Sequence, residues 1–324
     1  MDGVVDYVLM VVVIPAAIAV LLASTLLVFA SFSDARPQRK WCIEAIGFAV
    51  CVAFLLSFVR ELEWSAIVRQ VRVIEGDDAP FERWHRVGLL ALVLAIAAFP
   101  MAWLHASAAR LRPGLERIWF GAFALTASML VMLFVAFPGA NPWTQCGQGL
   151  LVLASIAAFA RCAHGAVLWM AWIVFAALAL LAGLGGFASL AVMCGAASAA
   201  AFGIAILAAI VGLRVHRAFN FISGGAMAVV LGTLVATVAR CGMAYDQAGV
   251  PWWAWTAIPI LPVGGSLFVR QARRAPFRAA DTLWRCAGML VLAAALAGAV
   301  AVSQASASEQ SDESDQDLSD MYGG

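Results

Sequence analysis

Long apolar stretches separated by short polar gaps are the dominant pattern along the chain. Ten stretches follow one another, and most are long enough to cross a bilayer, because a transmembrane helix needs about 20 apolar residues. One of them, Gly147–Ala160, is short, and joining it to a neighbour would leave nine spans. The predicted spans are Val4–Ser31, Cys42–Phe58, Val87–His105, Ile118–Phe137, Gly147–Ala160, Gly165–Leu184, Ala188–Leu213, Phe221–Ala239, Trp253–Val269 and Leu283–Ser303.

These stretches predict helices rather than strands. Every backbone N–H and C=O group inside a bilayer must be satisfied within the protein, so only helices and closed barrels can span it. Barrel strands alternate polar and apolar residues, whereas the run Leu89–Ala97 is apolar throughout. We therefore expect an all-α fold, a polytopic transmembrane helical bundle of about ten spans that occupies residues 1–303.

Arg and Lys fall mainly in every second gap, and this alternation predicts which way the bundle faces. Basic residues near the ends of spans favour the cytoplasmic side of a membrane. With the gap after the first span placed inside the cell, the inner gaps hold most of the 20 basic residues and the outer gaps hold most of the 19 acidic ones. Both termini are therefore expected on the non-cytoplasmic side.

Composition supports an integral membrane protein. Hydrophobic residues make up 64% of the chain and charged residues 12%, against roughly 45–50% and about 25% in soluble domains. The net charge of +1 gives no reason to expect nucleic acid as a partner. We expect a multi-pass protein of the cell's inner membrane, with the lipid bilayer as its first partner.

One predicted outer loop, residues 60–86, departs from the charge rule because it mixes arginines with carboxylates. Within it, apolar residues recur at helical spacing from Trp64 to Ile74, as in a helix that lies in the membrane interface. The charges predict a contact surface for a membrane or periplasmic protein, while ion pairing within the loop is the other explanation. The residues of this predicted partner site are Arg60, Glu61, Glu63, Glu82, His85 and Arg86.

The C-terminal residues 304–324 form a second polar segment. They are rich in Ser, Asp, Glu and Gln and carry almost no apolar side chains. Such a segment buries too little surface to offset the entropy of ordering it. We expect a disordered acidic tail, which offers a second contact for a partner.

The run from Glu82 to Arg86, Glu-Arg-Trp-His-Arg, resembles the Glu-x-x-His-Arg signature of the haem A synthases, which are polytopic haem-binding membrane enzymes. The resemblance covers these five residues. It implies that His85 is an axial haem ligand and that Glu82 is a catalytic or supporting carboxylate. Haem is therefore the one cofactor to consider, and otherwise we expect none.

The other histidines and the cysteines give little support for a metal site. His105, His164 and His216 all fall toward the predicted inner face, but no close ligand spacing links them. The seven cysteines contain no Cys-x-x-Cys pair, so we expect no bound metal. Cys146 and Cys241 are the two cysteines predicted at the oxidising outer face and form the candidate pair for a disulfide.

Span nine is the most strongly interrupted of the predicted helices, because two prolines and two glycines fall within Ile258–Gly265. Unwound backbone inside a bundle exposes carbonyls and helix ends that bind solutes, although proline kinks also occur without a substrate. Arg240 and Asp246, at the outer end of span eight, are further candidate contacts. The predicted substrate path is lined by Pro259, Pro262, Gly264 and Gly265.

Ionisable residues inside the membrane are functional by default, and this chain has few of them. Glu44, near the inner end of span two, is the only carboxylate clearly inside a span. This scarcity argues against a transporter that is coupled to an ion.

Three functions remain open. The leading hypothesis is a permease-like transporter of a small or amphipathic solute. The second is a non-catalytic membrane subunit or scaffold that meets a partner through the outer loop and the acidic tail, and the third is a haem-binding membrane redox enzyme. A cavity that reaches Pro259–Gly265 favours transport, whereas a solid, close-packed bundle favours the scaffold.

Overall fold

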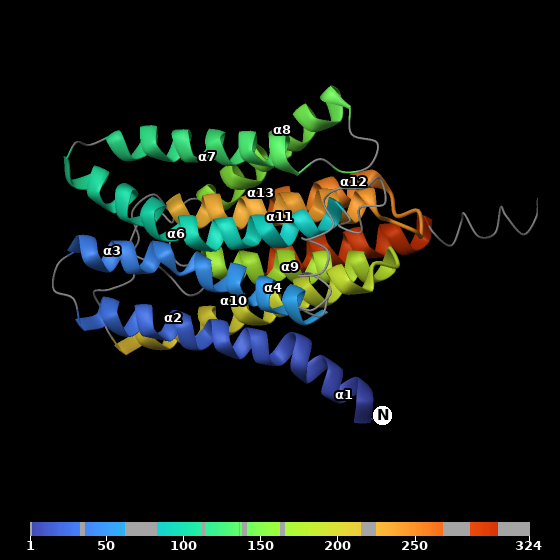
Figure 1. Ribbon diagram of the computed structural model, residues 1–324, viewed down its shortest axis with the longest axis horizontal. Helices are drawn as coiled ribbons and strands as arrows, with labels where there is room; N and C mark the ends of the chain where they lie inside the picture. The colour runs from blue at the N-terminus through green and yellow to red at the C-terminus, as the bar shows by residue number, and fades with distance from the viewer. Residues whose placement is uncertain are drawn as a thin grey trace, which may run out of the picture.

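The helices of the protein lie side by side along one axis (Figure 1). The computed structural model describes residues 2–32, 36–61, 83–111, 114–135, 137, 141–162, 166–214, 225–267 and 286–303. Within these ranges every regular element is helical and no strand occurs. This confirms the predicted all-α fold.

The first two spans are not uniform α-helices. In the first, a π-helical turn joins α1 to α2 without a break, and in the second, α3 and α4 are separated at Ile46. The elements of these spans are α1 (Asp2–Val8), η1 (Leu9–Val13), α2 (Ile14–Phe32), α3 (Arg36–Ala45) and α4 (Gly47–Glu61).

The remaining helices follow with short connections. They are η2 (Arg83–His85), α6 (Arg86–Leu111), α7 (Leu115–Phe134), α8 (Pro142–Arg161), α9 (Ala166–Leu184), α10 (Ala188–Arg214), α11 (Gly225–Ala244), α12 (Trp252–Ala257), η3 (Ile258–Ile260), α13 (Leu261–Leu267) and a C-terminal helix over residues 286–303. The start of α1 and the end of the C-terminal helix lie at the same end of the bundle (Figure 1).

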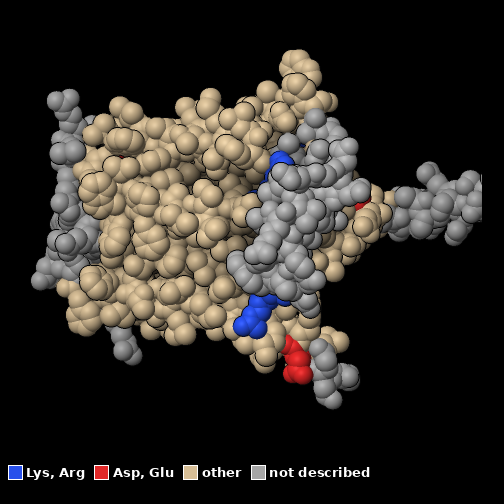
Figure 2. Space-filling view, viewed as in Figure 1, with Lys and Arg blue, Asp and Glu red and all other residues tan. Residues whose placement is uncertain are grey.

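Nine helices in the described part of the chain are long and apolar enough to cross a membrane. On the face that Figure 2 shows, few of the described side chains are charged, and those that are visible lie toward the end that holds the N-terminus. Together these features indicate a multi-pass membrane protein.

The short predicted span Gly147–Ala160 is a complete helix of 20 residues, α8. It begins five residues earlier than its apolar stretch because Asn141 and Thr144 form a capping box. The Asn141 side chain accepts a hydrogen bond from the Thr144 amide at 2.8 Å, and the Thr144 hydroxyl oxygen accepts one from the Asn141 amide at 2.8 Å. Pro142 occupies the first turn, where its missing N–H is harmless.

The interrupted segment Trp252–Leu267 is divided into α12, η3 and α13, as the prolines predict. At its start, Trp255 lies against Gly242 near the end of α11. At its other end, the Pro262 carbonyl accepts a hydrogen bond from the Cys162 thiol, directly after α8, with a sulfur–oxygen distance of 3.6 Å. The segment therefore runs from the end of α11 to the end of α8.

Helix α11 forms the centre of the bundle, and 17 of its 20 residues are buried. Its small residues let neighbouring helices approach closely. A Cβ atom on Gly232 would lie 2.8 Å from both the Cα and the backbone nitrogen of Ile156 in α8. At Gly47, just after the break between α3 and α4, a Cβ atom would lie 3.4 Å from the Cα of Met227. The break therefore lies directly against the first turn of α11.

Candidate functional site

A carboxylate and an imidazole pair inside the bundle at the break in the second span. Glu44 lies in the last turn of α3 and His105 lies near the end of α6, and these residues are only 2% and 3% exposed. The His105 Nδ1 atom lies 2.9 Å from Glu44 Oε1 and 2.8 Å from Glu44 Oε2. The imidazole therefore faces both carboxylate oxygens.

The start of α11 completes the surroundings of this pair. The backbone N–H of Ala226 donates a hydrogen bond to Glu44 Oε2 at 3.4 Å. Free amides and the helix dipole make the first turn of a helix partly positive, so it stabilises a carboxylate. A Cβ atom on Gly225 would lie 2.8 Å from His105 Cε1 and Nε2. Glycine at this position leaves the space that the imidazole ring occupies.

Two further charged side chains connect the pair to the end of the bundle. Lys40, one helical turn before Glu44, places its Nζ atom 3.7 Å from Glu44 Oε1. The same ammonium donates a hydrogen bond to Glu116 Oε2, in the first turn of α7, at 3.2 Å. The Glu116 side chain is 36% exposed. We call these four residues, His105, Glu44, Lys40 and Glu116, the ionic row.

Stability alone does not explain the ionic row. Burying an ion pair costs several kcal/mol per ion in desolvation, and apolar residues of similar volume are often as stabilising or more so. An ionisable group within a span is instead a marker of function by default. The ionic row is therefore the candidate functional site of the protein.

Sequence reasoning singled out Glu44 and noted His105, but it did not bring them together. They are 61 residues apart, and no short motif links them. One signal was available: both lie near the predicted inner ends of consecutive spans, so adjacent helices place them at a similar depth. That signal places Glu44 and His105 at a similar depth in the membrane, but it does not show which faces of their helices meet.

The residues of the predicted substrate path are used for packing where the structure describes them. Pro259 and Pro262 are buried. A Cβ atom on Gly264 would lie 2.6 Å from Leu292 Cδ1, so this glycine lets the C-terminal helix approach. Gly265 lies in α13, and its exposure is not among the described features.

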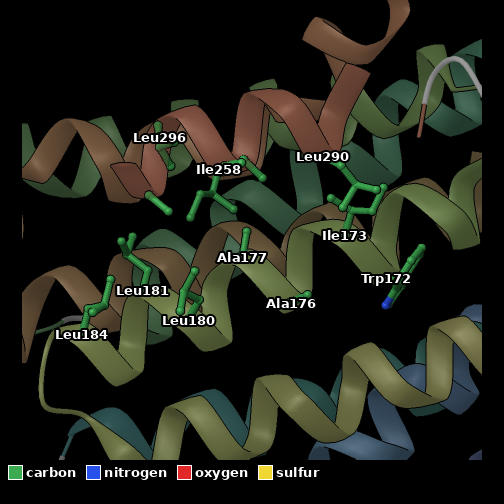
Figure 3. Close-up of a pocket in the computed structure, with 13 residues that line it drawn as sticks. Trp172, Ile173, Ala176, Ala177, Leu180, Leu181, Leu184, Ile258, Leu290 and Leu296 are labelled. Atoms are coloured by element: carbon green, nitrogen blue, oxygen red, sulfur yellow. The ribbon is translucent and has the colours of Figure 1, made fainter. Parts of the chain in front are cut away.

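A cavity of about 240 Å³ lies beside this path but is lined by other residues. Its walls are apolar side chains of α9, from Trp172 to Leu184, and of the C-terminal helix, from Leu290 to Ala297, together with Ile258 of η3 (Figure 3). None of the described side chains that line it is ionisable. Its chemistry suits hydrocarbon rather than a polar solute.

The two further candidate contacts for a solute, Arg240 and Asp246, are not joined by a hydrogen bond or ion pair in the described structure. The Arg240 guanidinium donates to the sulfur of Met243 at 3.4 Å. The Asp246 carboxylate accepts a hydrogen bond from the backbone N–H of Ala248 at 3.1 Å and thus stabilises the turn that follows α11.

The predicted partner site is described only in part, because Glu63 and Glu82 lie outside the described residues. Arg60 and Arg86 are exposed. Glu61 instead joins three helices, since it accepts hydrogen bonds from the hydroxyls of Tyr7 in α1 and, at 2.9 Å, Ser189 in α10. Glu61 thus has a role in holding the bundle together at this end.

His85, the predicted axial haem ligand, lies among aromatic side chains where the structure describes its surroundings. It is 4% exposed, and its ring centroid lies 4.2 Å from that of Trp84 and 6.1 Å from that of Phe58. His105, the other described histidine, is bonded to Glu44, and His164 and His216 lie outside the described residues.

The predicted disulfide partners are both free thiols in the structure. Cys146 is exposed, whereas Cys241 is buried in α11. Among the described residues, no cluster of three or more His, Cys, Asp or Glu side chains is arranged to hold a metal ion.

The fold and the site define a class of protein: a multi-pass α-helical membrane protein with a buried carboxylate–imidazole pair at a helix break. No family model matches the chain, and no curated protein and no solved structure is significantly similar to it. The function must therefore be argued from the site itself.

Proposed function

We propose that the protein is a permease-like transporter of a small or amphipathic solute in the inner membrane, and that the ionic row is its ion- or solute-handling centre. The observation that carries this proposal is the buried Glu44–His105 pair beside the broken α3–α4 span and the first turn of α11. Transporters commonly place their sites where discontinuous helices expose helix ends within the bundle.

The proposed topology has ten crossings. The segment Trp252–Leu267 is added to the nine long helices because its contacts extend from the end of α11 to the end of α8. An even number of crossings places both termini on one side of the membrane. The distribution of Arg and Lys favours the non-cytoplasmic side for them, so the ionic row belongs to the cytoplasmic end.

Close packing along α11 and around Pro259 favours a second candidate, a membrane subunit or scaffold. In that case the exposed Arg60 and Arg86 and the acidic tail are the contacts for a partner. The scaffold does not account for a buried ionic pair, and for that reason we rank transport first.

The proposal is tested with the full-length protein in liposomes on a solid-supported membrane. Currents are recorded as amino acids, organic acids, amines and sugars are applied in turn. We expect one class of solute to produce a current that falls at least tenfold in Glu44→Gln. The matched control is Glu61→Gln, which changes a carboxylate at the other end of the same span and is expected to retain the current. If the folded protein gives no current with any of the four classes of solute, the result favours the scaffold.

A further inference from the structure

Within the described residues, the Glu44 carboxylate is surrounded by nitrogen donors. These are His105 Nδ1 at 2.8 Å, the Ala226 amide nitrogen at 3.4 Å and Lys40 Nζ at 3.7 Å. Hard metal cations require several oxygen ligands, whereas Glu44 supplies the one carboxylate here and the Lys40 ammonium repels a cation. This set of groups therefore disfavours a hard metal cation and is compatible with a proton.

Resting on the proposed transport function, we propose that the ion taken up at the Glu44–His105 pair is the proton, which enters from the end of the bundle at Glu116. The scarcity of ionisable residues in the spans argued against coupling to an ion. The contact between α3 and α6 reverses that argument, because the few groups present are gathered at one place.

The charge of the ionic row favours the uptake of one proton. While the imidazole is neutral, one ammonium stands against two carboxylates and the row has a formal charge of −1. One added proton neutralises it, which lowers the cost of keeping the charges away from water.

The proton has a defined place to go. In the neutral ring, Nδ1 carries the hydrogen that is donated to Glu44, and Nε2 offers a lone pair. A hydronium ion loses one O–H bond, an N–H bond forms at Nε2 of His105, and water leaves. No electron is transferred, and the product is an imidazolium paired with the Glu44 carboxylate.

The helices packed around the pair bring few other charges to this level. Helix α2 contains no ionisable side chain. In α11 the first charged residue is Arg240, about 21 Å along the helix from Ala226 at 1.5 Å per residue. Helix α4 carries no charge before Arg60, at its far end, and α7 contributes Glu116 and the exposed Arg117. Besides His105, the described charged side chain of α6 is Arg86, at the opposite end of that helix.

The inference is tested by infrared difference spectroscopy on the full-length protein in lipid bilayers. The pH is lowered from about 8 to about 5, the range in which an imidazole changes charge. We expect both imidazole bands and a carboxylate stretching band to change, and each of Glu44→Gln and His105→Gln to alter both sets because the two groups act as a pair. Glu61→Gln, the matched control, is expected to leave both sets unchanged.

Two results would overturn the inference. One is an imidazole response that is the same in the native protein and in Glu44→Gln, since the groups would then be independent. The other is a carboxylate change that is produced by Na⁺ in place of choline at constant pH and lost in Glu44→Gln. The infrared experiment needs no solute, so it is independent of the transport assay. A response to protons without transport would refute the proposed function alone. Transport driven by Na⁺ without a response to protons would refute this inference alone.

A variant that leaves all ionisable groups in place provides a second test. In Gly225→Ala, the new Cβ atom lies 2.8 Å from the His105 ring and displaces it from Glu44. We expect the imidazole bands to remain and the carboxylate response to be lost. Gly121→Ala is the control, because a Cβ atom there has no neighbour within 4 Å. An unchanged carboxylate response in Gly225→Ala would contradict the proposed pairing.

Discussion

Replacing Glu44 and His105 by leucine, singly and together, measures how strongly the two residues are coupled. Each single variant leaves one buried ionisable group without its main partner. Loss of one partner of a buried pair costs about 3–5 kcal/mol. For His105→Leu we expect a loss of stability near the lower end of this range, because Lys40 and the Ala226 amide still contact Glu44.

The double variant is expected to cost about 2 kcal/mol less than the sum of the single variants. Residues in direct contact give coupling energies of about 0.5–3 kcal/mol, and two N···O distances below 3 Å in a buried site place this pair in the upper part of that range. A coupling of about 2 kcal/mol is a factor of about 30 in the unfolding equilibrium. It also exceeds the average of about 0.6 kcal/mol for hydrogen bonds between transmembrane helices.

The assay is reversible unfolding in mixed lipid and detergent micelles near pH 7, followed by tryptophan fluorescence. The control cycle combines Glu44→Leu with Ser198→Ala, because Ser198 donates its hydrogen bond to the Trp172 carbonyl and shares no partner with Glu44. The control coupling should be close to zero. A Glu44–His105 coupling of about 0.6 kcal/mol or less would refute the description of a strongly coupled, buried pair.

Three further predictions concern packing, thiols and topology. Gly232→Ala should destabilise the protein by about 1–3 kcal/mol because the added methyl group meets the backbone of α8. The control Gly121→Ala should stabilise it by up to about 1 kcal/mol. Equal unfolding midpoints for the two variants would contradict the close packing of α11 against α8. Cys146 should react with a maleimide in the folded protein without reductant, and the six buried cysteines should react only after unfolding. If Cys146 reacts only after a reductant is added, it forms a disulfide and the prediction is wrong. A cysteine at Ser311 should be labelled from outside intact cells, and labelling only after the membrane is opened would reverse the proposed orientation.

The sequence predicted the spans well because crossing a membrane demands long apolar helices, and composition records that demand directly. It also located the interruption of span nine, since Pro259 cannot supply a backbone donor. It placed the start of α8 too late, because the capping box of Asn141 and Thr144 adds polar residues to the first turn of the helix. Hydropathy does not detect such a start.

The site was harder to predict, for a different physical reason. A path through Pro259 and Gly264 was inferred from the interruption of the helix, but an interruption does not reveal what lies opposite it. The structure places Leu292 of the C-terminal helix against Gly264. The pairing of Glu44 with His105 depends on which faces of α3 and α6 meet, and the near-uniformly apolar α6 gives little periodicity from which to infer its inner face.

The central position of α11 has a consequence for the order in which the protein is made. Helix α11 follows α2 to α10 in the chain, yet it fills the space between α4, α6, α7 and α8. During synthesis, the earlier helices are made before α11, their common neighbour. The hydrogen bond from the Ala226 amide to the Glu44 carboxylate therefore cannot form until α11 has been made. Until α11 has been made, the faces of α4, α6, α7 and α8 that contact it lack their final partner, and a lipid, a chaperone or the insertion machinery can cover them.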